Sequence, residues 1–94
     1  MIIPDISIVS LTWNSEKHIE PFLKSLINDA SRSDIDIEII VIDNGSTDSS
    51  ISVLREYARK YCFVRFIPFS KNMGTTFSRN TAIKCASGEF ILVL

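Results

Sequence analysis

Polar residues follow the apolar stretches of this sequence, and their types suit the binding of an aromatic, hydrogen-bonding ligand. Trp13, the only tryptophan, lies one residue past an apolar stretch. It could stack on a nucleotide base, a contact worth ~1–3 kcal/mol. Asp43 ends the next stretch, where its carboxylate could accept hydrogen bonds from a base or a ribose. Arg79 adds a cation to a third segment, in which Gly74 permits close backbone approach.

Each of these residues also has a structural interpretation. Trp13 could be a lid over the core, Asp43 a turn-forming or helix-capping residue, and Arg79 a solvated surface cation. Asn44-Gly45 could form a hairpin turn, but five polar residues occupy positions 46–50, where the return strand would begin. Ser46 or Thr47 followed by Asp48 is instead typical of a helix start, whose free amides could face a phosphate.

Several motif classes are excluded. The glycines stand only at 45, 74 and 88, so the chain has neither a G-x-G-x-x-G loop nor a Gly-Lys-Ser/Thr motif. The loop at 12–14 lacks the acidic pair that a phospho-acceptor receiver domain requires. His18 is the only histidine, and Cys62 and Cys85 lack metal-ligand spacing, which argues against structural zinc. We expect both cysteines to be reduced and half-buried.

The chemistry-bearing segments are spaced by alternating strand and helix patterns. Continuous apolar runs predict strands at 6–11, 37–42, 63–67 and 89–94, the third stopped by Pro68. The first helix is expected to begin near His18, with Pro21 in or just past its first turn, and to precede a polar loop at 28–36. Apolar residues at helical spacing predict a second helix over 51–61. A third helix is expected within 72–87, capped by Gly88.

This order predicts an α/β fold with a Rossmann-like alternation, in which helices flank a parallel four-stranded sheet. Ligands of such sheets bind at the carboxyl ends of the strands. The loops that contain Thr12, Trp13 and Asn14 and the turn from Asp43 to Ser46 are therefore the candidate site.

Length and composition limit the remaining possibilities. The chain has 94 residues, of which 46% are hydrophobic, and a net charge of −1, so we expect one packed core and no broad cationic field for nucleic acid. The N-terminal residues lack the basic region and apolar core of a signal peptide, and no run approaches the ~18 apolar residues of a membrane span. A reducing cytoplasm is the expected location.

Taken together, the segments IVSLTWN, IVIDNGSTDSS and NMGTTFSRNTAIKCASGEFILVL resemble the nucleotide-binding half of family 2 glycosyltransferases, inverting enzymes of the GT-A fold. The resemblance implies that Trp13 and Asp43 hold the base of a nucleotide-diphosphate sugar. It also implies that Arg79 lies near the base or diphosphate and that Gly74 permits this approach. The remaining members of the implied binding site are Thr12, Asn14 and Asn44. With Asn at position 44, the segment IVIDNGSTDSS resembles the corresponding segment of the rhamnosyltransferase-type branch.

The resemblance further implies that residues 1–94 are a truncated nucleotide-sugar-binding part of a longer glycosyltransferase domain. The family's Asp-x-Asp motif, which binds Mg²⁺ or Mn²⁺, would follow Leu94 directly. We therefore expect no catalytic residue or metal ligand in this chain, which should be inactive alone. The parent would act on a saccharide or lipid-linked acceptor in cell-wall or polysaccharide synthesis, in the cytoplasm or peripheral to a membrane.

One alternative remains, a non-catalytic nucleotide-binding or protein-interaction module with the same fold. The apolar sequence at 90–94 also predicts self-association through the truncated sheet, because an uncovered apolar edge strand is a template for pairing.

Overall fold

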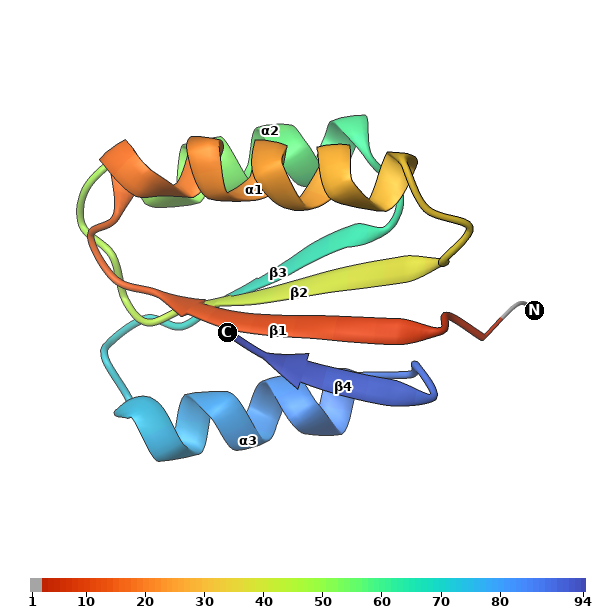
Figure 1. Ribbon diagram of the computed structural model, residues 1–94. Helices are drawn as coiled ribbons and strands as arrows, with labels where there is room; N and C mark the ends of the chain where they lie inside the picture. The colour runs from red at the N-terminus through yellow and green to blue at the C-terminus, as the bar shows by residue number, and fades with distance from the viewer. Residues whose placement is uncertain (1–2) are drawn as a thin grey trace.

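In the computed structural model, which describes residues 3–94, strands and helices alternate along the whole chain (Figure 1). The strands are β1 (Ile6–Thr12), β2 (Ile37–Asp43), β3 (Val64–Pro68) and β4 (Phe90–Val93). The helices are α1 (Glu16–Ser31), α2 (Ser50–Lys60) and α3 (Thr75–Cys85). The predicted α/β class and alternation are confirmed.

All strand pairs are parallel, in the order β3-β2-β1-β4. The chain runs outward from β1 to β2 and β3, then returns through α3 to place β4 on the other side of β1. The strand order therefore reverses between β1 and β4, the position where sheets of this kind bind ligands. Thr12 pairs with Asp43 in the sheet register, so the ends of β1 and β2 lie side by side.

Helices cover both faces of the sheet, with α1 and α2 on one face and α3 on the other (Figure 1). Successive strand residues point to opposite faces, so β1 and β2 supply two apolar cores. Ile39 and Val41 pack beneath α1 and α2, whereas Ile40 and Ile42 pack with Ala82 of α3. Because helices cover both faces of β2, its sequence is almost continuously apolar.

The boundaries differ from the sequence prediction at the first helix. It begins at Glu16 rather than near His18, because the Ser15 carbonyl already accepts the amides of His18 and Ile19 at 2.8 and 3.0 Å. Pro21 consequently lies inside the helix, where it lacks one backbone donor. The helix also continues to Ser31, so the following loop is shorter than the predicted 28–36.

The third helix also ends differently. It stops at Cys85 and is followed by Ala86 in an extended conformation, so Gly88 is not the helix cap that the sequence predicted. Gly88 is instead required by close packing, since a Cβ there would lie 2.7 Å from both the amide nitrogen and Oγ of Ser7.

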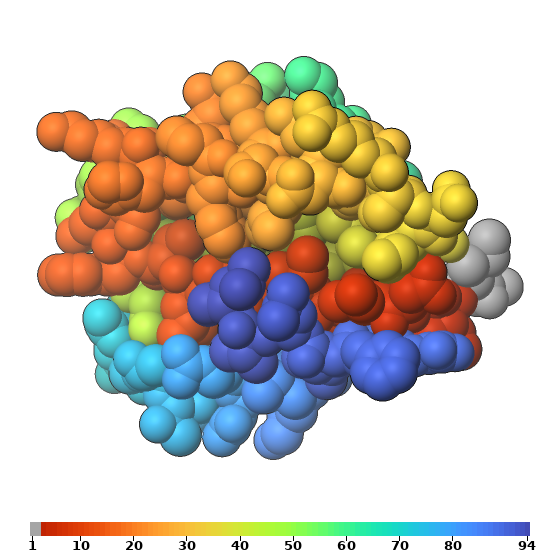
Figure 2. Space-filling view, viewed as in Figure 1, coloured from red at the N-terminus to blue at the C-terminus, as the bar shows by residue number. Residues whose placement is uncertain are grey.

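The last strand is the least covered part of the sheet. Its exposed fractions run from 41% at Val93 to 70% at Phe90. Figure 2 shows the C-terminal residues, in dark blue, on the surface between α1 and α3. Within the described part of the chain, each helix is too short or too polar to cross a membrane.

Candidate functional site

The predicted site residues of β1 and β2 meet at the carboxyl edge of the sheet. Thr12 and Asp43 end their strands and are joined by a hydrogen bond of 3.0 Å from Thr12 Oγ1 to Asp43 Oδ1. The Asn44 amide donates to the Thr12 carbonyl at 2.8 Å, which carries the pairing one residue beyond the strands. The structure therefore brings Thr12, Asp43 and Asn44 together, as their positions at the strand ends predicted.

Asp43 is fully buried, and its carboxylate organises the turn after β2. Oδ1 accepts the Ser46 hydroxyl at 2.6 Å, and Oδ2 accepts the Ser46 amide at 2.8 Å. With the bond from Thr12, three donors occupy a carboxylate that has about four acceptor positions. The structure thus gives Asp43 the turn-forming role and leaves limited acceptor capacity on Oδ2.

The loops after β1 and β2 are joined through Asn14. Its backbone has a φ of 48°, in the left-handed region that Asn tolerates better than most residues. The Asn14 amide donates to Ser46 Oγ at 2.8 Å, and its side-chain Oδ1 accepts the Thr47 amide at 2.8 Å. Asn14 thereby fixes the loop that carries Trp13 against the turn that follows β2.

The first turns of α1 and α2 cap each other. Asp48 accepts the Glu16 amide at 3.2 Å, while Glu16 Oε2 accepts the Ser49 amide at 3.1 Å. Asp48 also accepts the Ser50 amide at 2.9 Å. Partial burial alone would raise the pKa of Asp48, but hydrogen bonds from Ser50 and Glu16 outweigh it and lower that pKa. These internal bonds explain how both loops keep their shape.

Four amides in the turn before α2 and at its first residue are engaged within the chain. The amides of Ser46, Thr47, Ser49 and Ser50 all donate to side chains of this chain. Each of these four donors has an oxygen partner, so none of the four is free to bind an anion. Phosphate binding by the first turn of α2 stays a prediction. The capping partners Asn14 and Glu16 come from the preceding loop and helix, which local sequence patterns did not reveal.

Asn44 connects β2 to the start of α3. Its Oδ1 accepts the Met73 amide at 2.9 Å and the Ser78 hydroxyl at 3.0 Å, and its Nδ2 lies 3.4 Å from the Gly74 carbonyl. The side chain is 5% exposed, so Asn44 positions α3 rather than facing solvent. Ser78 is a member of this site that sequence analysis missed, because its partner is 34 positions away.

Two glycines shape the site. Gly45 has a φ of 80°, and a Cβ there would lie 2.6 Å from the Lys71 carbonyl carbon, so only glycine fits. Gly74 precedes α3 with a φ of 84° and has open space around its Cα. That space is consistent with the close approach predicted from the sequence. The requirement at Gly45 was not predicted, because Lys71 belongs to a distant loop.

Trp13 and Arg79 are the predicted residues that keep unused binding capacity. Trp13 is 56% exposed and stands outside both core clusters of the described residues, so it is not the core lid that was one interpretation. Arg79, on α3, is partly buried. Within residues 3–94 its Nε is buried without a hydrogen-bond partner. A ligand with an oxygen acceptor near Arg79 would satisfy that donor.

Metal-ligating side chains do not gather at this edge. Over residues 3–94 there is no group of three or more His, Cys, Asp or Glu side chains that could hold a metal ion. The Asp43 carboxylate is already engaged by hydrogen bonds. Both cysteines are free thiols, and Cys62 is exposed rather than half-buried as expected.

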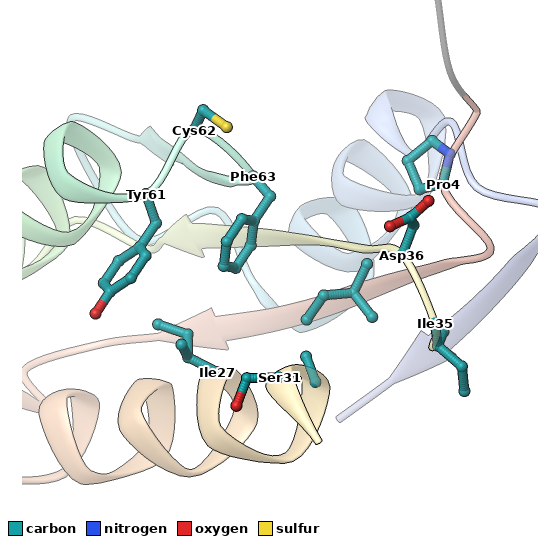
Figure 3. A pocket seen from close by; sticks show the side chains of 10 residues that line it. Pro4, Ile27, Ser31, Ile35, Asp36, Tyr61, Cys62 and Phe63 are labelled. Carbon is teal, nitrogen blue, oxygen red and sulfur yellow. The ribbon is translucent and has the colours of Figure 1, made fainter. Parts of the chain in front are cut away.

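Hollows of the surface lie both near the site and away from it. A small hollow of about 210 Å³ adjoins Thr12 beneath the first turns of α1. A broader one of about 600 Å³ lies at the opposite edge, where Tyr61 and Phe63 face Ile27 and Ser31 of α1 (Figure 3). The broader hollow is mainly apolar and lacks the converging polar groups of the carboxyl edge, so we place the site at that edge.

Comparison with known proteins identifies the family of this chain. Residues 7–94 match the model of the family described as "Glycosyl transferase family 2". The chain is 46% identical over 88 residues to the poly(ribitol-phosphate) beta-glucosyltransferase of Bacillus spizizenii. It is 33% identical over 87 residues to the cholesterol galactosyltransferase of Borreliella burgdorferi. Each alignment covers 93% of this chain. The chain belongs to glycosyltransferase family 2.

Solved structures show the same fold. The crystal structure of S. aureus TarS 1–349 in complex with UDP-GlcNAc superposes with a TM-score of 0.80 at 32% identity, covering 96% of this chain and 26% of the TarS 1–349 chain. The Pyrobaculum calidifontis mannosyltransferase PcManGT, at 22% identity and a TM-score of 0.70, shares the fold. The two curated relatives are matched over 14% and 23% of their lengths. The chain therefore spans about a quarter or less of these relatives.

Proposed function

We propose that residues 1–94 are the nucleotide-sugar-binding part of a longer, inverting glycosyltransferase. The parent would transfer a sugar from a nucleotide-diphosphate sugar to a hydroxyl acceptor. The observation that carries this proposal is the edge at the ends of β1 and β2, where exposed Trp13 adjoins the preformed Asp43 turn and where Asn44 connects β2 to α3, the helix that carries Arg79. The related TarS structure determined with UDP-GlcNAc supports a nucleotide-sugar donor.

Trp13 would bind the base by stacking. Its ring is 56% exposed in the absence of ligand, so a base can cover it without displacing core residues. Stacking of a base on an aromatic ring contributes ~1–3 kcal/mol. Trp13 is therefore the proposed contact with the largest single effect on affinity.

Asp43 and Arg79 would provide the polar contacts. An imide N–H of a base could donate to the remaining acceptor position of Asp43 Oδ2. Because Asp43 is fully buried, this contact requires a local shift of the residues that cover its carboxylate. Arg79 would donate to a base carbonyl or to the diphosphate. Thr12, Asn14 and Asn44 would hold these groups in place through the hydrogen bonds described above.

The catalytic base, metal ligands and acceptor site are proposed to lie in the remainder of the parent. The described residues do not fit a divalent cation, so we derive no catalytic step through one and expect no turnover by this chain alone. A Pyrobaculum calidifontis structural neighbour was solved with GDP-Man and Mn²⁺, which makes Mg²⁺ or Mn²⁺ a reasonable proposal for the parent.

The acceptor and setting are proposed from the relatives. A saccharide or lipid-linked acceptor and a role in cell-wall or polysaccharide synthesis are proposed because the relatives include a poly(ribitol-phosphate) beta-glucosyltransferase and a cholesterol galactosyltransferase. A cytoplasmic or membrane-peripheral location stays a prediction, as does the rhamnosyltransferase-type branch.

Calorimetric titration of the 94-residue protein with UDP, dTDP and GDP tests the proposal. We expect one of the three to bind and Trp13→Ala to weaken that binding about 5- to 150-fold, the equivalent of ~1–3 kcal/mol. The matched control is Phe90→Ala, which removes an aromatic ring that is 70% exposed on β4. Equal affinities of the Trp13 and Phe90 variants, or no binding of any nucleotide, would contradict the proposed site.

We also propose that a second copy of this chain pairs along β4. One edge of β4 pairs with β1 through Phe90 to Val93, which leaves the other edge available to a further strand. The strand sequence FILV contains no charge or proline that would discourage pairing. Pairing two such edges would cover apolar surface on both molecules.

A further inference from the structure

Glu38 is a buried charged residue that the proposed function does not use. It lies on β2, on the same face as Asn44, and is 8% exposed. The two residues are six positions apart, which corresponds to about 20 Å along a strand. Glu38 is therefore remote from the carboxyl edge. Burial of a carboxylate is costly unless hydrogen bonds or charges compensate.

Four donors converge on the Glu38 carboxylate. Oε1 accepts the Ser7 hydroxyl at 2.6 Å and the Ser87 amide at 2.6 Å. Oε2 accepts the Ser87 hydroxyl at 3.0 Å and lies 3.4 Å from Nη2 of Arg65. These donors come from β1, β3 and the turn between α3 and β4. Glu38 thus joins that turn to the centre of the sheet.

The partners of Glu38 extend the hydrogen-bond network to the two elements that flank this turn, α3 and β4. Arg65 Nη2 also donates to the Cys85 carbonyl at 2.9 Å, at the last residue of α3. The Ser7 hydroxyl accepts the Gly88 amide at 2.8 Å, just before β4. The network therefore holds the end of α3 and the beginning of β4.

The helix between these anchors buries only small side chains completely, although Ile83 and Cys85 also pack, partly buried, against the core. Its buried residues are Ser78 and Ala82, both small. Its 11 residues span about 16 Å, close to the separation of Glu38 and Asn44 on β2. Asn44 holds the start of α3, as described above, and Glu38 holds the end. Asn44, just after β2, thus contacts the start of α3, whereas Glu38 on β2 is linked to its end through Arg65 and to the following turn through Ser87.

We propose that Glu38 is a positioning residue that, together with Asn44, holds α3 and the α3–β4 turn in place on the sheet. Without the Glu38 contacts, residues 86–94 would separate from β1 more readily than the rest of the sheet opens. The end of α3 would also loosen, and with it the placement of Arg79. A changed placement of Arg79 would alter ligand binding, and only this effect rests on the proposed function.

The ionisation of Glu38 agrees with this role. Burial raises the pKa of the Glu38 carboxyl, but hydrogen bonds from Ser7 and Ser87 and the charge of Arg65 outweigh burial, so the pKa lies below its ordinary value of 4.5. Arg65 is the charged group that faces it in the described chain; Ser7 and Ser87 do not titrate. A lowered pKa means that the contribution to stability is complete above pH 4.5 and is lost as the pH falls through the folded-state pKa.

Amide hydrogen exchange of the 94-residue protein tests the proposal. Glu38→Gln should raise exchange rates at Gly88 and along β4 at least tenfold, while amides that pair β2 with β3 keep their rates. Ser87→Ala should give a smaller increase at the same amides. The matched control, Glu56→Gln, changes a glutamate whose side chain is 71% exposed and should leave the pattern unaltered.

An increase spread evenly over the sheet, or no increase at β4, would overturn the proposal. If Glu38→Gln does not fold, Ser87→Ala and acidification of the unmodified protein decide the question. Loss of residues 86–94 before the rest on acidification supports it, and loss of all strands in one step overturns it. Nucleotide affinity is a separate readout, expected to fall several-fold in Glu38→Gln. Absence of nucleotide binding by the unmodified protein would count against the proposed function alone.

Discussion

The two strands that flank β1 are held to it by different means. In β2, Glu38 to Asp43 are all buried, and Ile39, Ile40 and Ile42 are fully covered. In β4 every residue is exposed, although the strand pairs with β1 through the same kind of parallel ladder. Apolar packing fixes β2, whereas β4 depends on backbone pairing and on the polar network around Glu38. Strand pairing alone therefore does not indicate how firmly a strand is held.

The largest expected effect is a difference in stability between matched isoleucine substitutions on the two strands. Ile39→Ala on β2 should lower the free energy of unfolding by about 2–5 kcal/mol, because it leaves a cavity between the sheet and the helices. Ile91→Ala on β4 should cost less than about 1 kcal/mol, because Ile91 is already 42% exposed. Urea unfolding of both variants measures the difference. Similar losses for the two variants would show that the exposure of β4 does not describe the protein in solution.

A second comparison concerns the turns on either side of the site. Gly74→Ala should cost about 1–3 kcal/mol from backbone strain, because its φ of 84° and ψ of 161° suit only glycine. Gly45→Ala should cost more, since it adds a collision with the Lys71 backbone to the strain at a φ of 80°. Thermal unfolding measures both. A smaller loss of stability for Gly45→Ala than for Gly74→Ala would contradict the close contact between the turn after β2 and Lys71.

We expect the exposed strand β4 to mediate self-association of the chain. Sedimentation velocity at increasing concentration should show self-association of the unmodified chain, and Leu92→Lys should weaken it by adding charge to the β4 edge. Ile35→Lys is the matched control, because Ile35 is 44% exposed but lies outside β4. A clean monomer at high concentration would contradict pairing along β4, as would equal effects of the two lysine variants.

The sequence predicted the features that depend on local patterns. Apolar periodicity gave the type of every element, because strand and helix periods are local. The ends of the strands located Thr12 and Asp43 because parallel strands place their carboxyl ends at one edge. The start of α1 was misplaced because Pro21 suggested a later first turn than the Ser15 carbonyl permits.

The features that were missed depend on contacts between distant parts of the chain. Glu38 appeared as one polar residue in an apolar strand, and its partner Ser87 is 49 positions away. Gly88 looked like a helix cap, but its nearest neighbour is Ser7, 81 positions away. The amides of Thr47 and Ser49, just before α2, looked free because their acceptors, Asn14 and Glu16, come from another loop and helix. Such pairings cannot be read from local spacing.

Chemical-shift mapping of nucleotide binding tests the central claim most directly. The ¹⁵N-labelled 94-residue protein would be titrated with UDP, dTDP and GDP, and the shift changes placed on the structure. We expect changes at Trp13, at the Asp43 turn and at Arg79, with little change along β4. Changes that avoid these residues and gather instead at the hollow lined by Tyr61 and Phe63 would contradict it.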